Sequence, residues 1–291
     1  MKRILLFVAT NLAIMVTISI FLSLLGIGGY RLPGGGLDYS ALMVFCLIWG
    51  MAGSFISLAL SRFMAKRAMG VQLVDGRTGR EELDWLHATV RQLTDRAGLP
   101  MPEVGIYDSP EVNAFATGPS RSRSLVAVST GLLRGMRREE VEGVLAHEVS
   151  HIQNGDMVTM TLIQGVVNAF VMFFARVIAN VARNAVDEKV SYLVGFMTTI
   201  VLDIAFGVLG MVVVAWFSRA REFRADAGAG VLAGKGKMIA ALQRLQQNTQ
   251  MVDTSHPSLA TMKIAGSRGM LALLSTHPPL EARIAALQSA R

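Results

Sequence analysis

The sequence predicts a mainly α-helical membrane protein, in which four transmembrane helices carry a cytoplasmic α+β domain with a small β-sheet. Of its 291 residues, 52% are hydrophobic and only 17% are charged, which is too apolar a composition for an ordinary soluble domain. Four apolar runs are long enough to cross a bilayer as helices, for which about 20 residues suffice. Two polar stretches, residues 70–156 and 218–291, alternate with the paired runs and together are long enough for one compact domain.

The first two apolar runs, residues 4–27 and 41–60, predict an N-terminal transmembrane hairpin within residues 1–69. A cleaved signal peptide is the alternative for the first run, because a basic start precedes it. That run, however, exceeds the usual apolar core of about 7–15 residues, and residues 26–29 form a weak cleavage site. We therefore expect the first run to stay in the membrane.

A second transmembrane hairpin is predicted over residues 157–217. Its two apolar runs are residues 157–182 and 190–217, and the polar link 183–189 joins them. The hairpin separates the polar stretches, so the domain has to assemble from two pieces of chain.

Two charged residues, Arg176 and Asp203, interrupt the apolar runs of this second hairpin. A charge inside a membrane is costly unless it is paired or lies near an interface. We expect the two side chains to form an ion pair that joins the third and fourth helices. An ion or proton path is the alternative, although a transporter should show more than one such couple.

The basic residues indicate which way the hairpins face. Lys2, Arg3 and the basic cluster at residues 61–67 flank the first two spans on the side that carries the domain, whereas Arg31 is the only base in the loop 28–40. The positive-inside rule therefore places the domain and both termini in the cytoplasm. The net charge of +7 is accounted for by the ends of the spans, so we expect no nucleic-acid partner.

Helical spacing of apolar residues predicts five helices in the polar stretches, and short β-prone runs predict three strands that form a meander. The first helix follows a sequence, Thr78 to Glu81, that resembles a capping box. The helices are expected at residues 79–97, 137–154, 221–232, 237–250 and 277–287, and the strands at residues 104–107, 113–117 and 125–129.

The second of these helices contains a motif with metal-binding spacing, His147-Glu148-Val149-Ser150-His151. Residues four apart share a helix face, so the two imidazoles can bind one metal ion while Glu148 reaches a water molecule beside it. A single cysteine, Cys46, excludes an internal disulfide and a cysteine-only zinc site. The alternative interpretation is a coincidence on a surface helix, with both histidines solvated.

Hydrolytic zinc needs a third protein ligand and an open fourth position. The metzincin pattern does not supply it, since Asn154 and Met157 stand where that pattern has glycine and histidine. Glu222 is the better candidate, with Asp226 four residues later on the same helix to orient a ligand. Asp156 is interpreted as a cap of the third span.

Topology supports Glu222 independently. His151 precedes the third span by about six residues and Glu222 follows the fourth by about five, and two crossings return the chain to the same interface. The alternative is an ion pair of Glu222 with Arg219 or Arg221, because charge runs next to spans are common.

These motifs, together with Asn154-Gly155-Asp156, Arg221-Glu222-Phe223-Arg224-Ala225-Asp226 and His277-Pro278-Pro279, resemble those of the HtpX family of bacterial membrane zinc proteases, relatives of the CAAX prenyl endopeptidases. The resemblance covers essentially the whole chain. It implies a zincin-type (gluzincin) domain formed by residues 70–156 and 218–291, with one zinc ion per chain. The implied ligands are His147, His151 and Glu222, with Glu148 as general base and Asp226 as a supporting carboxylate.

The resemblance places His277 near the active-site cleft, in contact with the substrate or the oxyanion. The alternative role of His277 is that of a helix-start residue ahead of two prolines. His87 and His256 are expected to be structural or solvated.

The implied function is the degradation of damaged or misfolded membrane proteins in the bacterial inner membrane, in protein quality control and the stress response. An extended substrate peptide would pair with an edge strand at residues 113–116 or 125–129. Two other classes stay open: a membrane scaffold or chaperone with a structural metal, closed by Asp156, Asp226 or His277, and an ion or zinc transporter. The sequence does not determine the oligomeric state.

Overall fold

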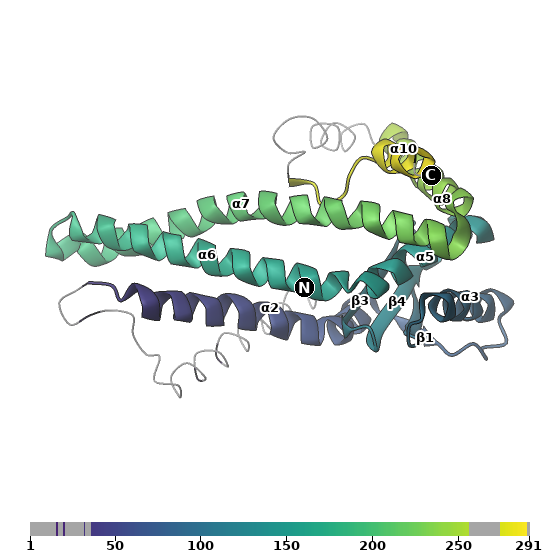
Figure 1. Cartoon of the computed structure of the whole chain (residues 1–291), viewed down its shortest axis with the longest axis horizontal. Helices are drawn as coiled ribbons and strands as arrows, with labels where there is room; N and C mark the ends of the chain where they lie inside the picture. Colours follow the sequence, from purple (N-terminus) through teal and green to yellow (C-terminus); the bar gives the residue numbers. More distant parts are fainter. Residues whose placement is uncertain (1–15, 17–19, 21–31, 33–35, 256–273, 290–291) are drawn as a thin grey trace. The chain divides into compact units, whose positions relative to one another are not determined.

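The computed structural model describes residues 16, 20, 32, 36–255 and 274–289 (Figure 1). His256 and all but two residues of the first predicted span therefore lie outside the described residues. The chain divides into two compact units. One comprises Met1–Ser57 and Met160–Val214, and the other comprises Leu58–Thr159 and Ala215–Arg291. We call the first the membrane unit and the second the soluble-type unit, and we describe each by itself.

Three described helices are long and apolar enough to cross a membrane. They are α2 (Tyr39–Met69), α6 (Asp156–Asn184) and the helix that starts with α7 (Glu188–Ala229) and continues to Asn248. Within the membrane unit, α6 and α7 run side by side and a short link joins them (Figure 1). These helices contain the second, third and fourth predicted spans.

Small residues bring α2 and α6 close together in the membrane unit. A Cβ atom at Gly50 would lie 2.6 Å from the carbonyl oxygen of Gly165 and 2.8 Å from the backbone nitrogen of Ala169. Gly165 and Ala169 are four residues apart, so they lie on one face of α6. Small residues at this spacing let helix backbones approach in membranes, where packing rather than water exclusion holds helices together.

The predicted ion pair between Arg176 and Asp203 is not formed among the described residues. Arg176 donates from Nη1 to the carbonyl oxygen of Met172 at 3.0 Å, and its guanidinium lies 6.0 Å from the ring centre of Phe45. The buried Oδ1 atom of Asp203 has no hydrogen-bond partner. The arginine is therefore satisfied within its own helix and by an aromatic face.

The soluble-type unit contains a four-stranded mixed sheet. Its strands are β1 (Gln72–Val74), β2 (Glu103–Tyr107), β3 (Ala114–Ser120) and β4 (Arg123–Ser129), in the order β1-β2-β4-β3. The pairs β1–β2 and β3–β4 are antiparallel, whereas β2–β4 is parallel. The three predicted strands are thus confirmed, but the predicted meander is wrong, because β2 and β3 do not pair and β1 was missed.

The order of the strands follows from their residues. The run 124–129 of β4 is buried on both faces, which suits a central strand. β3 contains Gly118 and Pro119, and proline cannot donate to a ladder, so this strand suits an edge. β1 has only three residues, too few for an alternating pattern to be recognised.

Five helices complete this unit: α3 (Glu81–Ala97), α4 (Thr130–Gly135), α5 (Arg138–Asn154), α8 (Lys235–Ser255) and α10 (Leu280–Ser289). A π-helical turn, η1 (Gly230–Gly234), joins α7 to α8. Residues of α3, α5, α8 and one sheet face form the main core. The last turns of α2 pack against the other face.

The predicted first helix is confirmed as α3, which ends at Gly98 in a left-handed conformation (φ 65°). Its predicted capping box is not formed. Thr78 donates instead from its backbone nitrogen and from Oγ1 to Asp84 Oδ1, both at 2.8 Å. Asp84, in the first turn of α3, thus forms the hydrogen bonds with Thr78 that the motif assigned to Glu81.

The contact between α2 and α6 can be tested with two glycines of one helix. Gly50→Val should lower the melting temperature of the purified protein, because overpacking a close contact costs about 1–3 kcal/mol. Gly53→Val is the matched control, since a Cβ atom at Gly53 would meet nothing within 4 Å. Equal melting temperatures of the two variants would contradict the close helix contact.

Candidate metal centre

Helix α5 presents two imidazoles on one face. Its start is stabilised by the backbone nitrogen of Arg137, which donates to Glu140 Oε2 at 2.8 Å, and it ends at Gly155 in a left-handed conformation (φ 69°). The Nε2 atoms of His147 and His151 lie 3.0 Å apart. Both side chains are largely buried, which argues against two solvated histidines on a surface helix.

Glu222 of α7 faces the same two nitrogens. Its Oε2 lies 3.5 Å from His147 Nε2, its Oε1 lies 3.3 Å from His151 Nε2, and the residue is 1% exposed. Arg221 Nε is 3.8 Å from Glu222 Oε1, beyond hydrogen-bond distance, and Arg219 donates to the carbonyl oxygen of Ser275. Glu222 thus makes a long ion pair with Arg221, as the alternative expected, and it also lies against both imidazoles.

The close approach of α7 to α5 depends on a small residue. A Cβ atom at Gly228 would lie 2.7 Å from Ser150 Oγ, so any larger side chain would press the two helices apart. Ala225 and Ala229 of the same helix are fully buried. These small side chains let Glu222 and the imidazoles of α5 meet.

Two carboxylates hold the outer nitrogens of the imidazoles. Asp226 Oδ1 lies 2.9 Å from His147 Nδ1, and Asp156 Oδ2 lies 2.7 Å from His151 Nδ1. A carboxylate on Nδ1 fixes the tautomer and the ring orientation so that Nε2 can bind a metal. Asp226 is placed as the supporting carboxylate that the sequence suggested, whereas the role of Asp156 was missed.

Asp156 reaches His151 because Gly155 reverses the chain. Gly155 adopts the left-handed conformation at the end of α5, and α6 begins with Asp156 directly after it. The aspartate thus starts the next helix and also touches the imidazole one turn back. The sequence signal for this contact was a glycine four residues after the second histidine, followed at once by an acid.

Arg283 of α10 was also missed. It forms a bidentate pair with Asp226, at 2.7 Å from Nε and 2.6 Å from Nη2, and it is 6% exposed. Its Nη1 lies 3.4 Å from Glu222 Oε2. The guanidinium of Arg283 compensates the buried negative charge beside the two imidazoles. Because Arg283 is far from these residues in the sequence, no local pattern indicated the contact.

The carboxylates change the proton affinity of the imidazoles. Burial by itself would lower the pKa of His151, but hydrogen bonds with Asp156 and Glu222 raise it to about 9. The pKa of His147 is raised against burial in the same way, by Asp226 and Glu222. A cation that binds here therefore displaces protons, as expected for histidine ligands.

The three side chains fit a tetrahedral metal ion. The closest approaches between the three side chains are 3.0–3.5 Å, with a different Glu222 oxygen nearest each imidazole, and one ligand atom from each side chain lies within 4.8 Å of the others. Tetrahedral zinc with bonds of about 2.0–2.1 Å separates its ligand atoms by about 3.3–3.4 Å. One imidazole pair and one carboxylate are also typical zinc donors. In the described part of the chain, His147, His151 and Glu222 are the group of three or more potential ligands that lie close enough together.

The other proposed ligands do not close the fourth position. Asp156 and Asp226 face the outer ring nitrogens. His277 Nδ1 lies 3.0 Å from Glu222 Oε2, and its side chain is 63% exposed. Glu148 is half-buried next to His147 and has no hydrogen-bond or ion-pair partner among the described residues, so its carboxylate is available to a water molecule.

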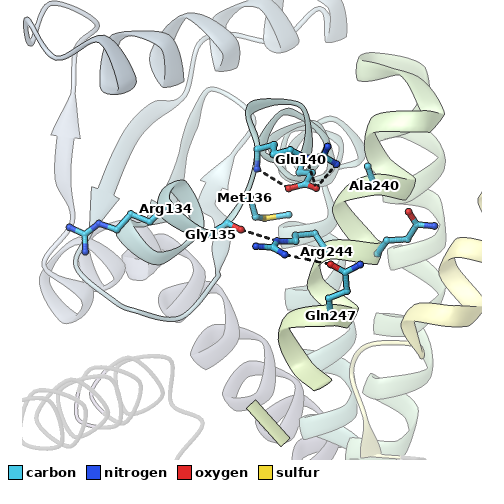
Figure 2. Close-up of a pocket in the computed structure, with 9 residues that line it drawn as sticks. Arg134, Gly135, Met136, Glu140, Ala240, Arg244 and Gln247 are labelled. Carbon is cyan, nitrogen blue, oxygen red and sulfur yellow. Dashed lines mark hydrogen bonds and ion pairs between the residues drawn. The ribbon is translucent and has the colours of Figure 1, made fainter. Parts of the chain in front are cut away.

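A cavity of about 460 Å³ lies elsewhere in the soluble-type unit, between the region around the start of α5 and helix α8. Its polar side chains satisfy one another: Arg137 binds Glu140, and Arg244 donates to the carbonyl oxygen of Gly135. Figure 2 shows Arg134 directed away from the other lining side chains. None of its lining residues belongs to the metal cluster.

Apolar helices of membrane-spanning length and a His-Glu-x-x-His helix completed by a distant glutamate define a class, the membrane metallopeptidases. The profile of peptidase family M48 matches residues 80–291. The chain is 52% identical to Protease HtpX of Shewanella sp. (strain W3-18-1) and 54% identical to Protease HtpX of Aeromonas hydrophila subsp. hydrophila. Each match covers 99% of this chain and 100% of the relative. The chain therefore belongs to peptidase family M48 and, within it, to the HtpX proteases.

A solved structure shares the fold. The crystal structure of S. mikatae Ste24p matches with a TM-score of 0.64 at 20% identity, over 98% of this chain. This chain spans 64% of the length of that protein. The likeness shows that this chain shares the fold of that protein.

The contribution of Arg283 can be measured by metal binding. Arg283→Met keeps an apolar stem but leaves the buried Asp226 without its cation, and we expect zinc affinity to fall about 10–100-fold, as for other supporting residues of metal sites. Arg244→Met is the control, because it removes an equal charge from the cavity lining. Competition with a chromogenic chelator gives both affinities, and equal affinities of wild type and Arg283→Met would contradict the role of the pair.

Proposed function

We propose that this chain is a zinc-dependent endopeptidase that cleaves misfolded or damaged membrane proteins on the cytoplasmic side of the bacterial inner membrane. The observation that carries the proposal is the close approach of His147, His151 and Glu222, one ligand atom of each lying within 4.8 Å of the others, with carboxylates beside the outer imidazole nitrogens. A free carboxylate, Glu148, lies beside them.

When bound, zinc supplies a water molecule of lowered pKa and polarises a peptide carbonyl. In the proposed mechanism, Glu148 accepts a proton from the attacking water and passes it to the nitrogen of the leaving amine. Glu222, His147 and His151 hold the metal. His277 lies against Glu222 through its Nδ1, so its Nε2 is the ring nitrogen left to contact a substrate oxygen.

The sheet suggests where a substrate peptide binds. The strand at residues 125–129 lies between β2 and β3, so its backbone is paired on both sides and the prediction for it was wrong. β3 pairs only with β4 and contains residues 114–116 of the other predicted segment. An extended peptide would add to this edge.

A structural metal in a scaffold or chaperone is less well supported. Such a site would need a fourth protein ligand, and two of the candidates, Asp156 and Asp226, are committed to the outer ring nitrogens. A transporter would need a polar path, and Arg176 is instead satisfied by a backbone carbonyl and an aromatic ring.

The role of Glu148 is tested by a charge-neutral replacement. Glu148→Gln should bind zinc in wild-type amounts but lose cleavage of fluorescently labelled casein by about two orders of magnitude or more, since it can no longer accept a proton. Glu139→Gln is the control, the same change at an exposed position of the same helix. Proteolysis by the Glu148 variant at the control's rate would refute the mechanism.

The membrane sidedness is tested at the link between α6 and α7. In a variant with Cys46→Ser and Val186→Cys, a membrane-impermeant maleimide added outside intact inner-membrane spheroplasts should label the new cysteine, because Val186 is exposed. A cysteine placed at exposed Arg80 in the soluble-type unit should react only after lysis. Labelling of the cysteine at position 80 before lysis, with labelling of Val186→Cys only after lysis, would contradict the proposed orientation.

A further inference from the structure

A second polar cavity, of about 290 Å³, lies in the membrane unit between the linked ends of α6 and α7. Arg176, Asn180 and Arg183 line it from one face of α6, at helical spacing. Tyr192, Phe196 and Thr199 line it from the facing stripe of α7. Polar groups thus converge in an otherwise apolar unit.

The two guanidiniums of this cavity have no carboxylate partner. Among the described residues, neither Arg176 nor Arg183 forms an ion pair, and Arg176 makes one hydrogen bond, to the carbonyl oxygen of Met172. Arg183 packs its stem over Gly195, where a Cβ atom would lie 3.3 Å from Arg183 Cβ. Asp203 acts electrostatically on Arg176 but forms no ion pair with it. Two guanidiniums at one cavity, neither of them bonded to a carboxylate among the described residues, favour an anion.

A buried acceptor in the same cavity also lacks a partner. Asn180 is 9% exposed, and its Oδ1 makes no hydrogen bond among the described residues. A buried amide oxygen without a donor is destabilising, so such groups normally have one. A ligand that carries a donor next to its anion would satisfy Asn180 and both arginines together. The cavity of Figure 2 shows no such deficit, because its buried Glu140 is fully paired.

The depth of the cavity matches the head-group layer of a bilayer. Along α6, the rise from Met160 to Arg183 is about 35 Å, which exceeds the roughly 30 Å of the hydrocarbon core. Arg183 in the last turn therefore reaches the phosphate level, whereas the backbone of Arg176, about 10 Å back along the helix, lies at the edge of the hydrocarbon core, from which a long arginine side chain extends toward the head groups. The cavity volume is close to the lower end of the range for small-molecule sites, about 300–1,000 Å³, and suits a head group rather than a whole lipid.

We infer that this cavity binds the head group of a phospholipid, with the phosphate on Arg176 and Arg183 and a head-group donor on Asn180 Oδ1. Guanidinium groups bind phosphate through several charge-assisted hydrogen bonds. Phosphatidylethanolamine supplies both the phosphate and N–H donors. Phosphatidylcholine supplies the phosphate without a donor, and diacylglycerol supplies no phosphate. The site is separate from the metal centre and does not rest on the proposed function.

Native mass spectrometry of the full chain in detergent, titrated with these three lipids at equal acyl composition, tests the site. Wild type should bind phosphatidylethanolamine several-fold, up to about tenfold, more tightly than phosphatidylcholine, and diacylglycerol least. Arg183→Ala should weaken both phospholipids by roughly ten- to hundredfold. Asn180→Leu should bind phosphatidylethanolamine and phosphatidylcholine equally tightly, and both of them more tightly than diacylglycerol.

Lys189→Ala is the matched control, because it removes an equal charge near the same connection but does not line the cavity. Unchanged zinc content and melting temperature show that each variant is folded. The proposed site would be refuted if Lys189→Ala and Arg183→Ala lost equal amounts of phospholipid affinity, or if the wild type bound the three lipids equally tightly. Displacement of phosphatidylethanolamine by millimolar inorganic phosphate would overturn the lipid assignment in favour of a soluble anion.

Discussion

The orientation of two imidazole rings is the constraint on which the rest of the site depends. His147 and His151 can present Nε2 to one cation only if their other nitrogens are held, and Asp226 and Asp156 hold them at 2.9 and 2.7 Å. Each carboxylate comes from a different helix, α7 or α6, directly next to an apolar span. The start of α6 and the last turns of α7, both in the soluble-type unit, therefore supply the third ligand and both supporting acids.

This arrangement places several charges in a buried space, and it is stable only because they compensate one another. Arg283 neutralises Asp226 and lies near Glu222, while the raised pKa of His151 reflects two neighbouring carboxylates. A divalent cation that replaces the two imidazole protons balances the same carboxylates with an equal charge. The site is thus built for a cation, and its residues are connected closely enough that removing one should disturb the others.

Local patterns predicted the parts of the chain in which neighbours in sequence decide the structure. The spacing of His147 and His151 and the periodicity of α3 and α5 are of this kind, and Glu222 followed from counting membrane crossings. The sheet order could not be predicted, because it depends on the burial of β4 on both faces. The contact of Arg283 was not predicted, because a bidentate pair between α7 and α10 has no local signature in the sequence. The predicted Arg176–Asp203 ion pair was wrong, because Arg176 donates to a backbone carbonyl oxygen instead.

X-ray absorption at the zinc edge of the metal-loaded protein tests the central claim most directly. The account predicts one zinc ion per chain with a first shell of nitrogen and oxygen at about 2.0–2.2 Å and scattering from two imidazoles, and loss of one oxygen ligand in Glu222→Ala. A single imidazole, a sulfur shell at about 2.3 Å, or an unchanged shell in the Glu222 variant would contradict it.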